Sequence, residues 1–306
     1  MATKSEKNIS KVSVKKKIQF KDIIPYIYIA PMVILLLVFS GYPFVQGIWQ
    51  SFFIDDGVNY REFVGLKNFI DVLTRDRLFW ISMRNLFYLF LGMNVCVLMP
   101  VLAAKLTYSI VSERAKLFIR SAFTIGTVVP SVITLMVWKF IYYPGIGMVA
   151  RICAFLGVAE PNLLGNPDTA ILAIIFMGFP WVSGLSYLML FAGLQSIDSS
   201  IIESAKIDGS TNWKTFFKIE FPIIKPIFIS LYALAFIGQF NDYERFLILT
   251  QGGPDNATLT PALYMYQKAF GNPASTEYGY ACAIAVILLI INLCLSKILI
   301  GKSEQD

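Results

Sequence analysis

Long apolar runs without a charged side chain constrain this sequence more than any other feature. The six runs lie at residues 23–54, 85–104, 121–138, 169–197, 226–241 and 278–296. A helix that crosses a bilayer needs about 20 apolar residues, because the hydrocarbon core is about 30 Å thick. The fifth run reaches that length only if its helix continues past Asp242, Glu244 and Arg245 into residues 246–249. We therefore predict an all-α, polytopic membrane protein with six transmembrane helices.

Composition excludes the other broad classes of protein. Charged residues make up 15% of the chain and hydrophobic residues 56%, and the mean hydropathy is +0.63. Soluble domains carry about 25% charged residues, and disordered chains combine low hydrophobicity with high net charge. A membrane β-barrel is excluded as well, because its strands alternate apolar and polar residues and these runs do not.

The basic residues predict how the chain is oriented. The expected spans cover residues 25–50, 84–108, 119–142, 169–195, 223–249 and 278–300. With the N-terminus inside, 17 of the 26 Lys and Arg residues lie on the cytoplasmic side, as the positive-inside rule requires. Both termini are then cytoplasmic.

This orientation divides the chain into a cytoplasmic basic tail (1–22), a membrane domain (23–300) and a cytoplasmic tail (301–306). The membrane domain includes one long cytoplasmic loop, residues 196–222. A basic tail can also indicate nucleic-acid binding. Lysines before a first span are more typical of an orientation signal that contacts anionic lipid, so we expect the lipid bilayer as a partner and no nucleic acid.

Few residues in the chain are suited to catalysis or metal binding. Histidine is absent, and the four cysteines are scattered without a Cys-x-x-Cys pair. A histidine acid–base site is excluded, and neither a metal site nor a catalytic residue is expected. Within the spans only Asp242 and Glu244 are acidic, too few for paired acid–base groups. An intramembrane enzyme therefore stays an alternative of another class, and we expect a protein that is not an enzyme.

The cytoplasmic loop 196–222 has the turn signals of two short helices. Ser199 or Ser200 can cap a first helix, which Gly209 ends by supplying a left-handed residue. Ser210 or Thr211 can cap a second helix, which the proline at the end of the loop stops. Such a loop could lie on the bilayer as an amphipathic segment, or it could be gripped by a soluble partner as a coupling element. The residues alone leave both interpretations open.

The loop also carries a motif, made of Glu203, Ser204, Ala205, Asp208, Gly209, Phe216, Ile219, Phe221 and Pro222. Its spacing resembles the EAA motif of ABC-importer permeases, E-A-A-x-x-x-G followed nine residues later by I-x-L-P. Ser204 and Phe221 are mild departures from it. The resemblance implies that the loop sits in a cleft of an ATPase subunit, with Glu203 facing basic groups and Gly209 forming the turn. The residues expected to couple to the ATPase are Glu203, Ser204, Ala205, Asp208, Gly209, Ile219 and Pro222.

Further segments narrow the resemblance to the sugar permeases. Residues 63–69, 249–254 and 278–281 are similar to the opening and closing sections of that group. The chain resembles the large membrane subunit of the maltose importer, without its two extra N-terminal spans and its outer insertion. The resemblance implies the permease fold of a type I ABC importer and a location in the inner (plasma) membrane of a bacterial cell.

Three places inside the predicted spans could hold a sugar. They are Thr127 with Ser131, residues 178–181, and residues 239–243. Sugars stack on aromatic rings and bind amides, carboxylates and hydroxyls, so a site in the membrane needs such groups facing the bundle interior. The four-residue spacing of Thr127 and Ser131, and of Met177 and Trp181, puts each pair on one helix face.

Each of these side chains also has a structural interpretation. Thr127 and Ser131 could bond back to a helix carbonyl, and Trp181 could pack or sit in an interfacial belt. Asp242 could pair with Arg245, three residues away on a helix. A buried carboxylate costs several kcal/mol unless it is solvated or partnered, so Asp242 is the hardest to assign to packing.

Matching motifs to the maltose subunit places the sugar-lining positions on Thr127, Ser131, Met177, Trp181, Ala235, Gln239 and Asp242. Met177 and Ala235 are apolar matches. Asp242 stands where that subunit has an amide, which implies a different sugar. The substrate-binding residues expected here are Thr127, Ser131, Met177, Trp181, Gln239, Asn241 and Asp242.

The resemblance implies a membrane-spanning subunit of an ATP-driven, binding-protein-dependent importer that moves an oligosaccharide by alternating access. It implies four further kinds of component: a second homologous permease, which would make the membrane domain a heterodimer, two ATPase subunits, an extracytoplasmic solute-binding protein and the oligosaccharide. ATP and Mg are expected on the ATPase, with no cofactor in this chain. A permease for a glycerol phosphodiester or a polyol is the alternative in the same class.

Overall fold

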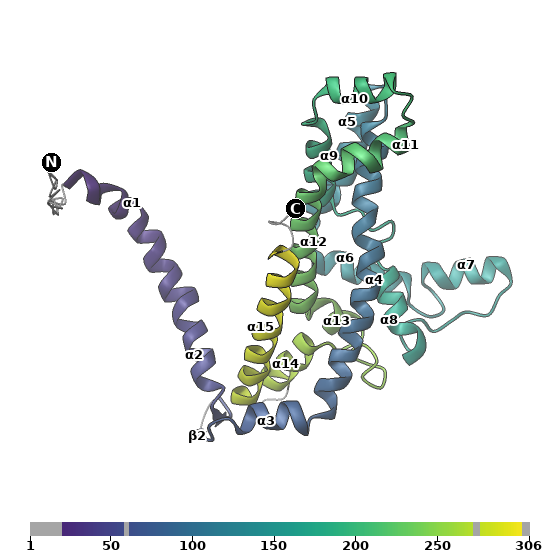
Figure 1. Cartoon of the computed structure of the whole chain (residues 1–306). Helices are drawn as coiled ribbons and strands as arrows, with labels where there is room; N and C mark the ends of the chain where they lie inside the picture. The colour runs from purple at the N-terminus through teal and green to yellow at the C-terminus, as the bar shows by residue number, and fades with distance from the viewer. Residues whose placement is uncertain (1–19, 58–60, 272–275, 302–306) are drawn as a thin grey trace, which may run out of the picture. The chain divides into compact units, whose positions relative to one another are not determined.

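The computed structural model describes residues 20–57, 61–271 and 276–301 as an almost entirely helical chain (Figure 1). The chain separates into two units, residues 1–49 and residues 50–306. The predicted tails, 1–22 and 301–306, lie almost wholly outside the described residues. The helical architecture confirms the expected fold class.

From Phe20, where the described residues begin, the first unit is one long apolar helix. Helix α1 (Phe20–Leu36) continues through a π-helical turn, η1 (Leu37–Gly41), into α2 (Tyr42–Gln50). Its large side chains are exposed, with Tyr28 82% and Phe39 72% accessible. An apolar surface of this extent needs lipid or protein around it, as expected of the first span.

The second unit starts with a small hairpin and is otherwise helical. Strands β1 (Phe53–Asp55) and β2 (Arg61–Phe63) pair antiparallel, with Phe53 opposite Phe63. The helices that follow are α3 (Lys67–Thr74), α4 (Arg77–Tyr108), α5 (Glu113–Ile125), η2 (Gly126–Val128), α6 (Ser131–Ile141), α7 (Met148–Leu156), α8 (Pro167–Phe176), α9 (Gly184–Gln195), α10 (Ser199–Ile207), α11 (Asn212–Thr215), η3 (Phe216–Glu220), α12 (Phe221–Asn241), α13 (Glu244–Leu249), α14 (Pro261–Phe270) and α15 (Tyr278–Gly301).

Four described helical segments are long and apolar enough to cross a membrane. They are Tyr26–Gln50, Arg77–Tyr108, Asn212–Asn241 and Tyr278–Lys297, and the number rises to six if each of two bent helix pairs is one span. These segments overlap the first, second, fifth and sixth predicted spans. The count of six spans and the orientation of the termini stay predictions.

The third and fourth predicted spans are not straight helices. The axis turns by 96° between η2 and α6. Val129 is extended there, because the ring of Pro130 disfavours a helical conformation in the residue before it. The fourth span ends as α8 at Phe176 and restarts as α9 at Gly184, so the chain is irregular between them.

The fifth predicted span also differs from its expected limits. One helical rod runs from Asn212 to Asn241 through α11, η3 and α12. Asp242 is extended (φ −77°, ψ 101°) and ends it, so residues 244–249 form the separate helix α13. The helix therefore begins before residue 223 and ends before residue 249.

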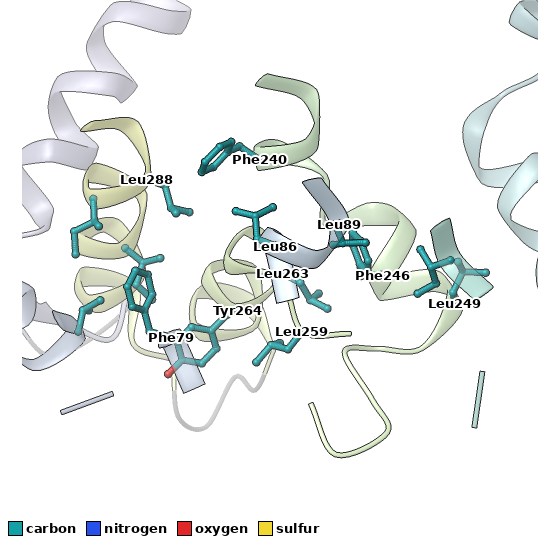
Figure 2. Packing of buried hydrophobic residues seen from close by; sticks show 14 of the residues in the cluster. Phe79, Leu86, Leu89, Phe240, Phe246, Leu249, Leu259, Leu263, Tyr264 and Leu288 are labelled. Atoms are coloured by element: carbon teal, nitrogen blue, oxygen red, sulfur yellow. The ribbon is translucent and has the colours of Figure 1, made fainter. Parts of the chain in front are cut away.

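Helix α4 holds the second unit together. Towards its N-terminus, Phe79, Leu86 and Leu89 pack in one apolar cluster with Phe240 and Leu263 (Figure 2). Towards its C-terminus, a second cluster contains Val101, Ala104, Tyr187, Leu190, Phe191, Leu194, Ile197, Phe216, Ile224 and Leu231. A single helix thus connects two cores, one near each end of this unit.

Asp76, the residue that directly precedes α4, connects this helix to two others. Asp76 caps α4 by accepting hydrogen bonds from the amides of Leu78 and Phe79. Its other oxygen accepts the hydroxyl protons of Tyr264 in α14 (2.6 Å) and Tyr280 in α15 (2.7 Å). Partial burial raises the pKa of Asp76, but these hydrogen bonds outweigh it, so the pKa lies below its ordinary value of 3.8.

Candidate functional site

Helices α4, α8, α12 and α13 and the irregular chain after α8 line a cavity of about 160 Å³. Its lining residues are Leu89, Met93, Cys96, Ile175, Met177, Trp181, Gln239 and Arg245. A neighbouring cavity of about 380 Å³ shares Met93, Cys96, Trp181 and Gln239 with it. We call the two together the Trp181 cavity. Apolar walls with a few converging polar groups are typical of small-molecule sites.

Three polar residues form a chain at this cavity. Nη2 of Arg245 lies 2.8 Å from Oδ2 of Asp242 and donates a hydrogen bond to Oε1 of Gln239 at 3.1 Å. Nε2 of Gln239 and Nε of Arg245 are buried without a hydrogen-bond partner among the described residues. Buried donors are normally paired, so both atoms are suited to an acceptor on a bound molecule.

The chain between α8 and α9 fixes the indole of Trp181. Its Nε1–H donates to the carbonyl of Ile175 at 2.9 Å. The ring packs edge-on against Phe179 (5.0 Å between centroids) and Phe176 (5.7 Å). Gly178 has φ +84°, a conformation that glycine adopts without strain, and it turns the chain sharply enough for this packing.

The loop 196–222 forms two short helices joined by a tight turn. Asp198 caps α10 by accepting from the amide of Ser200, so the predicted cap at Ser199 or Ser200 is wrong by one or two residues. Gly209 has φ +75° and ends α10, as predicted. Thr211 caps α11 by accepting from the amide of Lys214.

The second helix of the loop does not stop at Pro222, contrary to the sequence prediction. It continues into α12 through η3, where the amide of Phe221 bonds to the carbonyl of Phe216. Pro222 lies two residues after η3, where the hydrogen bonds already depart from the α-helical pattern. Its missing N–H therefore falls at this irregular turn, and the rod continues past it. The loop is therefore continuous with α12.

The motif residues of the loop divide between its surface and its base. Glu203, Ser204, Asp208, Gly209 and Pro222 are exposed, Ile219 is half-buried and Ala205 is buried. Beside them lie exposed apolar side chains: Ile207, Phe217 and Trp213, which are 86%, 63% and 47% accessible. The loop stands at one end of the second unit, at the opposite end from α3 and α14 (Figure 1), with its charged and apolar groups available to a partner.

Comparison with known proteins decides the family. Residues 74–299 match the family described as "Binding-protein-dependent transport system inner membrane component". The chain belongs to this family.

The relatives of this permease are also named as permease proteins of transport systems. This chain is 29% identical to the multiple sugar-binding transport system permease protein of Streptococcus mutans, over 89% of this chain and 92% of the relative. It is 27% identical to the trehalose/maltose transport system permease protein of Thermococcus litoralis (92% and 94% covered). It is 30% identical to the sn-glycerol-3-phosphate transport system permease protein of Brucella abortus (92% and 95%).

A solved structure shares the fold of this permease. A chain of a bacterial ABC transporter involved in the import of the acidic polysaccharide alginate superposes with a TM-score of 0.80 at 19% identity, covering 93% of this chain and 96% of that one. The ABC-importer permease fold expected from the sequence is therefore confirmed. Family membership also confirms the inner-membrane location and a transport subunit rather than an enzyme.

The permease brings together only some of the substrate residues expected from the sequence. Met177, Trp181 and Gln239 line the Trp181 cavity, and Asp242 reaches it through Arg245. Asp242 does pair with Arg245, which was the structural alternative to a sugar contact. The pair forms across the break after α12 and not on one helix.

Three other residues from the expected set lie outside the lining of this cavity. Thr127 donates to the carbonyl of Thr124, the back-bonding alternative. Ser131, at the start of α6, donates to Glu244 at 3.2 Å. Asn241 donates to the carbonyl of Ile237, one turn earlier in α12.

Sequence reasoning missed most of the residues that line the cavity, among them Arg245, Met93 and Cys96. The sequence suggests Arg245 only as a possible partner of Asp242, yet it lines the cavity. Met93 and Cys96 come from α4, where nothing in an apolar run distinguishes a cavity-facing residue from a packed one. The charged interruption in the fifth run was the one available signal for Arg245.

Proposed function

We propose that this permease is one of two homologous membrane subunits of an importer that moves an oligosaccharide by alternating access. The observation that carries the proposal is a continuous connection within one chain. The rod α11–η3–α12 begins in the exposed loop 196–222 and reaches Gln239 at the Trp181 cavity. Movement of the loop can thereby change the cavity.

The chemistry of the cavity favours a sugar. The indole of Trp181 offers an aromatic face or edge, and the buried donors of Gln239 and Arg245 are suited to hydroxyl oxygens. Asp242 adds an acceptor. Two relatives are named as permeases for sugars, which supports this substrate class. We assign Met177, Trp181, Gln239 and Asp242 to substrate binding.

A phosphate ester is the second candidate. The Brucella abortus relative is named for sn-glycerol-3-phosphate, and Arg245 provides a guanidinium at the cavity wall. Asp242 already neutralises this guanidinium at 2.8 Å, which disfavours a dianionic phosphate in the same place. We therefore rank the neutral sugar first.

The partners follow from the loop. We propose that Glu203, Ser204, Ala205, Asp208, Gly209, Ile219 and Pro222 form the contact with an ATPase subunit and its supporting turn. A pair of ATPases would bind ATP and Mg, a second permease would complete the membrane domain, and a solute-binding protein would deliver the sugar. The exposed Ile207, Trp213 and Phe217 supply apolar area for the ATPase contact.

The test is ATP hydrolysis by the complete importer in reconstituted vesicles. A panel of oligosaccharides and sn-glycerol-3-phosphate is supplied, each with the cognate solute-binding protein. We expect stimulation by one group of oligosaccharides. Stimulation by the phosphate ester alone would replace the sugar assignment with the second candidate, and no stimulation by any compound would contradict the proposal.

A further inference from the structure

A buried ion pair fastens the loop 196–222 to α4. Nζ of Lys105, in the last turn of α4, lies 2.5 Å from Oε2 of Glu220, the last residue of η3. The two side chains are only 7% and 1% exposed. Because 115 residues separate them in the sequence, the pair joins two parts of the fold that the chain does not connect locally.

Aromatic and apolar groups surround this pair. Nζ of Lys105 lies 5.6 Å from the ring centroids of Phe216 and of Tyr108. Phe216, itself a loop residue, is 2% exposed and belongs to the same apolar cluster as Ala104 and Phe191. The loop therefore contributes to the core beneath it through both Phe216 and Glu220, while its opposite side stays exposed.

Stability alone does not account for a pair in this setting. Removing two charges from water is expensive, and well-packed apolar residues of similar volume are often as stable or more so. The best-attested role of buried charged and polar groups is to hold one particular register. Here the register is the position of η3, and with it the loop, against the end of α4.

Where α4 reaches the Trp181 cavity, it contains a point at which the helix is weakened. Pro100 lies within the helix, five residues before Lys105. Proline has no N–H to donate to the carbonyl of Cys96, four residues earlier, so the helix is more easily bent there. Pro100, Val97, Cys96 and Met93 all line the cavity.

We propose that the Lys105–Glu220 ion pair transmits movement of the loop to the cavity wall on α4, with Pro100 as the pivot. The proposal rests on the proposed function, because it presupposes that ATP moves the loop. Lys105 and Glu220 act as positioning residues, since neither lines the Trp181 cavity and neither is exposed to a partner.

A native cysteine at the cavity can report this movement. Cys96 is half-buried and lines the cavity between Met93 and Pro100. In the complete importer, Cys153, Cys282 and Cys294 are replaced by alanine. The rate at which a water-soluble maleimide labels Cys96 is then measured in membrane vesicles, with and without Mg·ATP and vanadate. We expect ATP to change the rate in this parent protein.

The informative variants remove or exchange the pair without leaving a lone buried charge. Lys105→Met/Glu220→Leu replaces both partners with apolar groups, and we expect it to assemble and hydrolyse ATP but to lose the ATP-dependent change at Cys96. The exchange Lys105→Glu/Glu220→Lys re-forms a pair and is expected to recover part of the change. Lys116→Met/Glu113→Gln removes an ion pair within α5 (2.7 Å) and is the matched control.

A second variant tests the pivot with the ion pair intact. Pro100→Ala restores a backbone donor and makes α4 harder to bend there, so the response at Cys96 should fall. An unchanged ATP response in both Lys105→Met/Glu220→Leu and Pro100→Ala would overturn the inference and leave the proposed function standing. If ATP does not change the labelling rate of Cys96 in the parent protein, that result contradicts alternating access itself, and the inference with it.

Discussion

Asp242 and Arg245 pair across a break in the helical rod that begins in the loop 196–222. The rod ends at Asn241, and the carboxylate of Asp242 lies 2.8 Å from the guanidinium of Arg245. The same guanidinium donates to Gln239 on the last turn of α12. The pair thus ties the two sides of the break together at the wall of the Trp181 cavity.

Asp242→Asn should weaken substrate use more than it weakens assembly. The variant exchanges a charged hydrogen bond for a neutral one at a site whose two side chains are 28% and 22% exposed. Solvent reduces the loss, so we expect the apparent KM for sugar-stimulated ATP hydrolysis to rise by roughly tenfold at most. Asp71→Asn, which breaks an exposed pair with Arg75 on α3, is the control. An unchanged KM in Asp242→Asn would remove Asp242 from the substrate site.

Trp181→Ala should lower sugar uptake, and Trp181→Phe should retain more of it. Alanine loses the aromatic surface at the cavity, whereas phenylalanine keeps a ring and loses only the bond to Ile175. Trp80→Ala is a matched control, because its indole also donates to a backbone carbonyl, that of Leu73, but does not line the cavity. Uptake by Trp181→Ala equal to that by Trp80→Ala would assign Trp181 to packing.

Glu203→Lys should uncouple ATP hydrolysis from transport. Glu203 is exposed on α10, so reversing its charge leaves the chain folded but opposes the basic groups expected on the ATPase. The measurement is the ratio of stimulated to basal ATP hydrolysis in vesicles, with the amount of permease in the membrane checked on a gel. Asp71→Lys makes the same reversal on α3, at the other end of the second unit, and should leave the ratio intact. Coupling that survives Glu203→Lys would place the ATPase contact elsewhere.

Gly209→Pro tests the turn of the same loop independently of charge. Gly209 has φ +75°, which proline cannot adopt because its ring holds φ near −65°. The variant should misplace α11 relative to α10 and abolish sugar-stimulated hydrolysis. Gly209→Asn is the milder comparison, since asparagine tolerates the left-handed region, and should keep most of the stimulation. Equal effects of the two substitutions would show that the backbone conformation at 209 is not what coupling requires.

Asp76→Asn should destabilise the end of the second unit opposite to the loop, in a pH-dependent way. The pKa of Asp76 is lowered in the folded protein by bonds from Tyr264, Tyr280 and two amides. Its contribution is therefore complete above its ordinary pKa of 3.8 and is lost as the pH falls through the lower, folded value. We expect Asp76→Asn to lose roughly 1–2 kcal/mol at pH 7 and the difference from the native protein to shrink below about pH 4.

Thermal unfolding of the purified complex in detergent at several pH values measures this difference. Tyr264→Phe removes one donor and keeps the carboxylate, so it should lose less than Asp76→Asn at pH 7. A stability difference that stays the same from pH 7 down to about pH 2 would mean that the charge of Asp76 contributes nothing and that only its capping role matters.

The sequence alone determined the class of this protein, because hydropathy and turn chemistry are local. Apolar runs predicted the membrane helices, and a left-handed glycine at 209 with Thr211 after it predicted the turn and second cap of the loop. The motif around Glu203 predicted the family, which the comparison confirmed.

Only the tertiary structure decided which residues meet. Cys96 and Met93 come from an α4 run without polar pattern and reach Trp181 and Gln239 through packing between segments far apart in the chain. The pairing of Lys105 with Glu220 spans 115 residues, and no local periodicity encodes it. The break at Asp242 could not be predicted from the sequence either, because apolar runs on both sides of a charged residue also fit one continuous helix. Local patterns fix what each segment can become, whereas a cavity and a buried ion pair depend on how distant segments pack.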